Sequence, residues 1–98
     1  MTKTFRYLGT KFSIDTTTLI LQSSEADVYE HFNKQLKRNY VSWRTKDGQV
    51  HMTTKARLIC TAFHGQPGPN AQCAHIDDDS ANDAPSNLCW MTRKENNS

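Results

Sequence analysis

The chain has 98 residues, of which 36% are hydrophobic, and a net charge of +2. This length fits one small domain, and the apolar fraction is near the lower edge for a domain that folds alone. The charge is too weak to identify a nucleic-acid partner by itself, whereas an aromatic content of 9% argues against disorder. The three cysteines form no closed disulfide set, and no segment predicts a signal peptide or a membrane span. We therefore expect a cytoplasmic protein without membrane partners.

The charges are distributed unevenly along the chain. The acidic side chains concentrate at Asp77, Asp78, Asp79 and Asp83. The basic side chains cluster elsewhere, at Lys34, Lys37, Arg38, Arg44, Lys46, Lys55, Arg57, Arg93 and Lys94. A protein that brings phosphate to a metal-binding centre would show this segregation.

Three elements are predicted in the N-terminal half. Residues 5–22 alternate moderately, with a turn at Gly9, and predict an antiparallel hairpin. Residues 23–39 predict a helix, with Ser24 at the N-cap and an apolar stripe. That stripe consists of Val28, Phe32 and Leu36. Residues 40–53 predict a second hairpin, because Asp47-Gly48 suits a tight turn.

The C-terminal half begins with a predicted helix over residues 54–65, which Gly65 ends, and a loop over residues 66–70. Two short strands follow, over residues 71–76 and 88–91, and a polar loop joins them. Thr92 and Glu95 have the spacing of a capping box, so a further helix is expected to start there. The predicted class is α+β.

The polar loop and its flanks carry the candidate chemistry. His75 lies on the first strand, Asn87 ends the loop, and Asn96 falls on the first turn of the final predicted helix. If the helix folds back over the two strands, a base that titrates near neutral pH faces an oxygen ligand suited to a hard cation. Asn87 can bond backbone groups across the loop and so hold His75 in place. This arrangement suits hydrolysis of a phosphodiester.

The run "HIDDDSANDAPSNLCWMTRKENN", His75 to Asn97, resembles the HNH endonucleases of the phage and homing type. With the preceding helix and Pro-rich loop, the resemblance covers residues 50 to 97. It implies a ββα-metal motif, with His75 as general base, Asn96 as a metal ligand and Asn87 as the structural asparagine of the catalytic motif. It also implies a divalent cation, Mg²⁺ or Mn²⁺, and DNA as the substrate, cut or nicked.

The resemblance divides the chain into two parts. Residues 50–98 would form the HNH nuclease motif, and residues 1–49 a β-hairpin and helix module that contacts DNA. Four basic residues are candidate contacts to the phosphates: Arg93, Lys94, Arg57 and Lys55. For Lys55 and Arg57 an ordinary solvated helix face is an equal alternative. A homodimer would let a protein with one site cut both strands.

One position departs from the family pattern. The residue before the histidine often supplies a metal ligand, but here it is Ala74. Asp77 or a water could fill the gap, the site could be degenerate, or the alanine could have been introduced to stop cleavage. An inactive, DNA-binding HNH module is therefore the second reading. A third is a zinc-stabilised interaction domain that uses Cys60, His64, Cys73 and Cys89.

Overall fold

A computed structural model describes residues 1–92, which form three antiparallel sheets and one α-helix. The strands are β1 (Thr2–Tyr7), β2 (Thr10–Asp15), β3 (Leu21–Gln22), β4 (Ala26–Asn33), β5 (Arg38–Thr45), β6 (Val50–Thr54), β7 (Ala71–His75) and β8 (Leu88–Thr92). The helix is α1 (Lys55–His64), and a 3-10 turn, η1 (Pro85–Asn87), precedes β8. The predicted α+β class is confirmed. The predicted final helix of a ββα motif, with the capping partner Glu95, lies outside the described residues.

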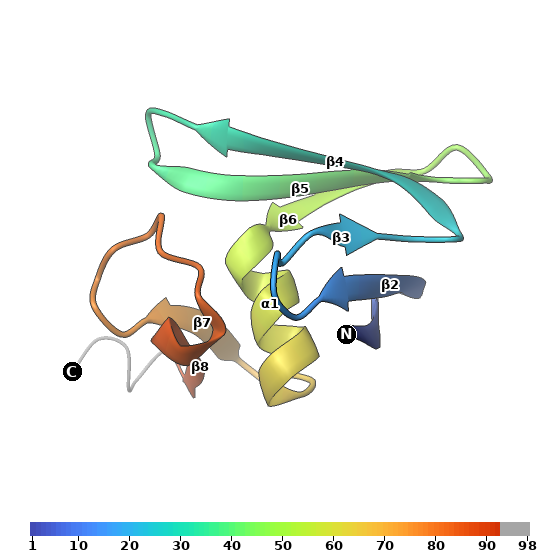
Figure 1. Cartoon of the computed structure of the whole chain (residues 1–98). Coiled ribbons are helices and arrows are strands. Elements are labelled where there is room, and N and C mark those ends of the chain that lie inside the picture. The colour runs from blue at the N-terminus through green and yellow to red at the C-terminus, as the bar shows by residue number, and fades with distance from the viewer. Residues whose placement is uncertain (93–98) are drawn as a thin grey trace.

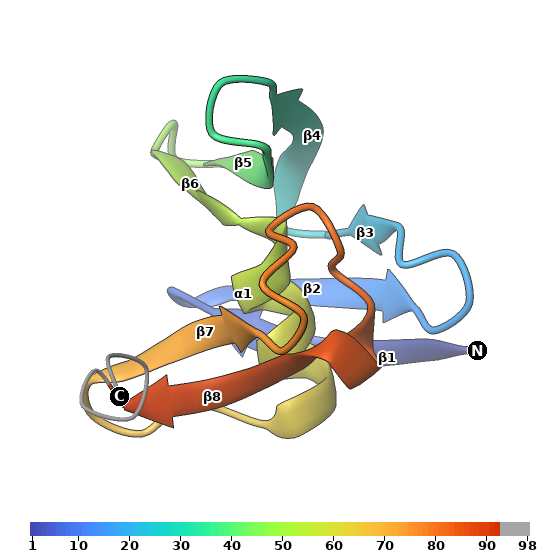
Figure 2. The same cartoon turned by 90° about the vertical axis from the view of Figure 1, so that its left-hand side faces the viewer.

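The helix α1 lies at the centre of the molecule (Figures 1 and 2). The β1-β2-β3 sheet and the β7-β8 hairpin lie on opposite sides of it, and the β4-β5-β6 sheet covers the end where the helix begins. No helix within residues 1–92 is long and apolar enough to cross a membrane. In this arrangement the loop between β7 and β8 lies beside the turn that joins β4 to β5 (Figure 1).

The hydrophobic core takes side chains from both halves of the chain. Trp43 is fully buried at its middle, and the ring of Phe12 meets it edge to face at a centroid distance of 5.1 Å. Leu58 and Ile59 of α1 are also fully buried, and Leu88 joins them from β8. Burying a side chain of this kind contributes about 1.5–3 kcal/mol, so the C-terminal half depends on the N-terminal strands for its stability.

The predicted helix over residues 23–39 is wrong. Residues 26–33 form β4, which pairs with β5 from Ala26↔Thr45 to Asn33↔Arg38. The side-chain oxygen of Asn33 accepts hydrogen bonds from the backbone N–H groups of Gln35 and Leu36. These bonds stabilise the turn between β4 and β5.

Tertiary pairing overrides the helical spacing of the apolar residues. Val28 packs against the core, but Phe32 and Leu36 are 49% and 58% exposed, so the expected stripe covers nothing. The run Val28 to Phe32 is rich in β-branched and aromatic residues, which suit a half-buried strand. The apparent N-cap, Ser24, precedes β4 and caps no helix.

The other elements predicted within residues 1–92 are confirmed, except that β3 adds a third strand to the first hairpin. Leu8 and Gly9 both have positive φ, as a tight two-residue turn between β1 and β2 requires, and Gly48 does so in the β5-β6 turn. Thr54 caps α1 by accepting the N–H of Arg57, and the N–H of Gly65 bonds Thr61 beyond the helix end. Residues 71–75 and 88–92 form the expected strand pair, in which His75 lies opposite Leu88.

Candidate active site at the end of β7

His75 is the last residue of β7, and its backbone position is fixed by the strand pair. The N–H of Ile76 donates to the carbonyl of Asn87 at 2.8 Å, which carries the pairing one step past His75. Ala74 beside it is buried. The imidazole therefore projects from a rigid strand end into the start of the polar loop, where a reacting group can be held in place.

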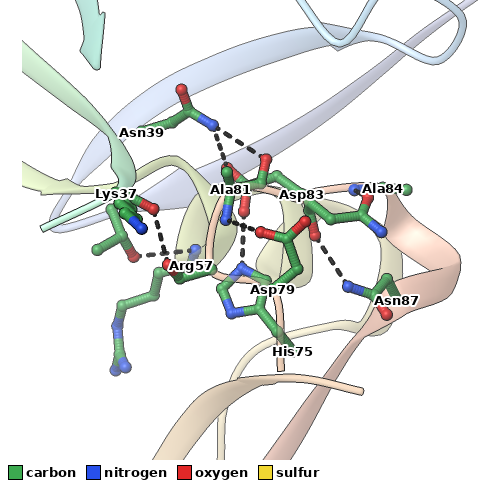
Figure 3. Close-up of polar contacts among 12 residues, drawn as sticks. Lys37, Asn39, Arg57, His75, Asp79, Ala81, Asp83, Ala84 and Asn87 are labelled. Carbon is green, nitrogen blue, oxygen red and sulfur yellow. Dashed lines mark hydrogen bonds and ion pairs between the residues drawn. The ribbon is translucent and has the colours of Figure 1, made fainter. Parts of the chain in front are cut away.

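The imidazole is bound by a carboxylate of the loop. Nε2 of His75 lies 2.8 Å from Oδ1 of Asp83, and the two side chains are only 10% and 8% exposed. The other carboxylate oxygen of Asp83 accepts a hydrogen bond from Nδ2 of Asn39 at 3.0 Å (Figure 3). A continuous chain of hydrogen bonds thus runs from β5 through the loop to the candidate base.

Asn87 joins the two ends of the loop. Its Nδ2 donates to Oδ1 of Asp77 at 2.8 Å and to the carbonyl of Asn82 at 3.0 Å, and its Oδ1 accepts the N–H of Asp77 at 3.1 Å. The residue is 8% exposed. These contacts are the kind that the sequence led us to expect of this residue, but its catalytic importance stays a prediction.

The carboxylate of Asp77 is occupied within the loop. Besides Asn87, it accepts hydrogen bonds from the side chain of Asn82 and the N–H of Asp79. These donors favour its charged form, with Asn82 the strongest, and hold the pKa of Asp77 below its usual value. The loop conformation shown here therefore belongs to the ionised carboxylate.

The predicted phosphate contacts fall into two groups. Lys55 pairs with Glu30 of β4, and the Nε of Arg57 donates to the hydroxyl of Tyr7 at 2.8 Å. The guanidinium of Arg57 also lies 5.2 Å from the centre of the Trp90 ring. Both cations are thus already engaged, and a role in binding DNA remains a prediction. Arg93 and Lys94 lie outside the described residues.

The side chains of residues 1–92 do not gather a divalent-cation site by themselves. Ala74 has no ligand atom at the position where the family often has one. Asp77 lies beyond the end of β7, so it does not share a strand face with His75, and both of its carboxylate oxygens accept hydrogen bonds within the loop. The alternative that Asp77 fills the gap stays a prediction. No group of three or more His, Cys, Asp or Glu in this range could hold a metal ion. The predicted ligand Asn96 lies outside the range.

The absence of a metal-binding group within residues 1–92 also contradicts the alternative of a zinc-stabilised domain. Cys60, Cys73 and Cys89 are free thiols, and His64 directs its Nε2 to the carbonyl of Pro85 at 2.8 Å. The neighbouring Cys73 and burial raise the pKa of the Cys60 thiol, which stays protonated. The four residues form no metal group within the described chain.

Sequence reasoning missed two members of the site, Asp83 and Asn39. Asp83 is one of several acids in a polar loop, and nothing in its spacing distinguishes it from Asp78 or Asp79. Asn39 was assigned to the end of a helix, and the error over residues 23–39 hid its position on β5. A correct strand assignment would have placed Asn39 on the same face of the strand as Val41, opposite to Tyr40. It would not have shown that Asn39 lies beside the loop.

Comparison with known proteins supports the assignment of the C-terminal half. Residues 54–98 match the family model described as HNH endonuclease. No curated protein and no solved structure matches the chain. HNH endonucleases act on DNA and typically use divalent metal ions. The matched segment holds α1, the β7-β8 hairpin and the loop with His75 and Asp83. The family match therefore identifies residues 54–98 as a segment similar to the HNH endonucleases.

Proposed function

We propose that the protein is a divalent-metal-dependent endonuclease or nickase that hydrolyses phosphodiester bonds of DNA, with His75 as general base. The observation that carries the proposal is the bond between Nε2 of His75 and the carboxylate of Asp83. It occupies one ring nitrogen and leaves the other to accept a proton from the attacking water. We infer nicking for a single chain, because one chain has one such histidine.

The cation would stabilise charge on the phosphoryl group and the departing oxygen. We propose Mg²⁺ or Mn²⁺, with Asn96 as a protein ligand. The chain's own part is to fix His75. The β7-β8 pair sets its backbone, Asp83 binds its ring, and Asn87 closes the loop around it.

We further propose that the N-terminal part contacts DNA through the outer face of the β4-β5-β6 sheet. Val41 and Trp43 point into the core, so their neighbours on β5 point away from it. Arg38 and Arg44 are exposed on this outer face. Aromatic and apolar side chains lie between and beside them, namely Tyr29, His31, Tyr40 and Met52, with His31 stacked on Tyr40.

Two observations support this face as the DNA-contacting part. Tyr29 and Met52 are 59% and 61% exposed, which is unusual for large side chains on a sheet. The turns at the ends of the sheet add Lys34, Lys37 and Lys46. The basic side chains therefore outnumber the acidic ones, Asp27 and Asp47. Positive charge with interleaved aromatic rings suits phosphates and bases. Closer to His75, the phosphate backbone of the DNA would be held by the other candidate cations, namely Arg57, Lys55, Arg93 and Lys94.

The test is conversion of supercoiled plasmid to the open circle with Mg²⁺ or Mn²⁺. The wild type should nick the plasmid, chelation should stop it, and His75→Ala should abolish it. His64→Gln is the matched control, because it alters a second histidine that is exposed and keeps a hydrogen-bond donor towards Pro85. Nicking that persists in His75→Ala would contradict the mechanism.

A second candidate is a DNA-binding HNH module that does not cleave, and Ala74 favours it. In that case the wild type binds DNA without nicking it, and Ala74→Asp restores nicking that again depends on His75. Nicking by the wild type itself would exclude this candidate.

A further inference from the structure

We propose that Asp83, held in turn by Asn39, is the positioning residue that fixes His75 with its proton on Nε2 and its lone pair on Nδ1. The consequence for catalysis rests on the proposed function, but the tautomer itself does not. The N-terminal sheet would thereby control the state of the base in the nuclease half.

The first step is the hydrogen bond to the imidazole. An ionised carboxylate has no hydrogen to donate, so at 2.8 Å from Oδ1 of Asp83 the Nε2 atom must carry it. In the neutral ring the lone pair then lies on Nδ1. No hydrogen bond joins Nδ1 to another residue of the described range 1–92. The bond is almost dry, since both side chains are 10% exposed or less.

The second step is the orientation of the carboxylate. Nδ2 of Asn39 donates to Oδ2 of Asp83 at 3.0 Å and lies 3.5 Å from the carbonyl of Ala81. Both neighbours accept only, which fixes the Asn39 amide with its nitrogen towards the loop. Nearby, the hydroxyl of Ser80 donates to the carbonyl of Lys37 at 2.7 Å. Figure 3 shows Asn39 and His75 approaching Asp83 from opposite sides.

Because Asn39 and His75 both donate to Asp83, the substitution Asp83→Asn should reverse the hydrogen bond to His75. Asn39 still offers a donor, so the new amide must turn its oxygen to Asn39 and its NH₂ group to His75. Nε2 must then accept, and the proton moves to Nδ1. The ring keeps its place but loses the lone pair that the reaction needs, and an enforced wrong tautomer is a known way to disable a histidine base.

Exchanging the two groups should reverse the effect. In the double variant Asn39→Asp with Asp83→Asn, the carboxylate at position 39 accepts from the amide NH₂ at position 83. The amide oxygen then faces His75 and accepts from Nε2. Ser80→Ala is the matched control, because it removes a loop anchor to Lys37 without touching the Asn39, Asp83 and His75 contacts.

The experiment records ¹⁵N shifts of the His75 ring in the full chain at about pH 8, where an ordinary imidazole is neutral, beside plasmid nicking. We expect the proton on Nε2 in the wild type, in Ser80→Ala and in the exchanged variant, and on Nδ1 in Asp83→Asn. Nicking by Asp83→Asn should fall about 10²-fold or more in kcat, with KM little changed, and recover in the exchanged variant.

The outcomes separate this inference from the proposed function. A His75 tautomer that does not change in Asp83→Asn overturns the inference, even if nicking falls, because the role is then structural only. Tautomers that follow the expected pattern in a protein that never nicks DNA support the positioning role and contradict the nuclease function.

Discussion

Nδ2 of Asn87 lies 2.8 Å from Oδ1 of Asp77, while Oδ1 of Asn87 accepts the N–H of the same residue. The two residues are ten positions apart and hold the loop closed through a reciprocal pair of hydrogen bonds. Because a side-chain amide offers both donors and an acceptor, few other residue types could make both contacts. This closure keeps Asp83 within reach of His75.

Asn87→Ala should therefore loosen the loop. It removes three hydrogen bonds from a nearly buried position, each worth about 0.5–1.5 kcal/mol, and leaves the Asp77 N–H without this partner. We expect a loss of about 2–3 kcal/mol in the free energy of unfolding and a larger loss of nicking. Urea denaturation and the plasmid assay measure the two effects. Ser86→Ala, next to it and exposed, is the control, and equal behaviour of the two variants would contradict the role of Asn87.

The pH dependence of the loop follows from Asp77. Because its pKa is lowered in the folded state, its ionised form stabilises the fold above the ordinary value near 3.8, and this contribution is lost as pH falls through the folded-state pKa. Asp15 and Asp47 have lowered pKa values as well, so they add to the same loss of stability at acidic pH. Asp77→Ala should make the fall in the free energy of unfolding with decreasing pH less steep. An unchanged slope of stability against pH below about 5 would show that the loop bonds contribute nothing.

Much of the fold was predictable because local chemistry determined it. The positive φ at Gly9 and Gly48 marks turns that few other residues form, and Thr54 and Gly65 bound α1. The strand-loop-strand order around His75 followed from two apolar runs separated by polar residues.

The errors have one cause, which is contact between residues distant in sequence. Residues 26–33 have a helical spacing, but their pairing with β5 and the Asn33 turn decide the outcome. The contact between Asn39 and Asp83 spans 44 positions. No local pattern reports it, so the histidine was found and the residues that orient it were not.

The reassignment of β4 can be tested by stability. Leu36 would have been a core residue of the predicted helix, but it is 58% exposed in the turn, so Leu36→Ala should change the free energy of unfolding by less than about 0.5 kcal/mol. Val28→Ala should cost about 1 kcal/mol or more, because Val28 packs against the core. Equal large losses would favour the helix.

Trp43 should be the most sensitive core position. Its ring is fully buried and contacts both Phe12 and Tyr7 edge to face. Trp43→Ala should cost about 3–5 kcal/mol, much of the stability of a small domain. Trp43→Phe should cost clearly less, since it removes a buried indole N–H that has no partner among the described residues. Circular dichroism during urea denaturation measures both, and equal losses would contradict this ranking.

The sheet face should show its role in the salt dependence of DNA binding. In a His75→Ala background, which avoids cleavage, Arg44→Ala and Arg38→Ala should each weaken binding to unrelated duplexes and reduce the slope of log K against log salt by about one. Tyr29→Ala should weaken binding with little change in that slope, because it removes a ring and no charge. Lys11→Ala is the charge-matched control, since Lys11 is exposed on β2 in a different sheet. If Lys11→Ala weakens binding as much as Arg44→Ala, the effect is one of net charge, and the outer face of the β4-β5-β6 sheet is not the contact surface.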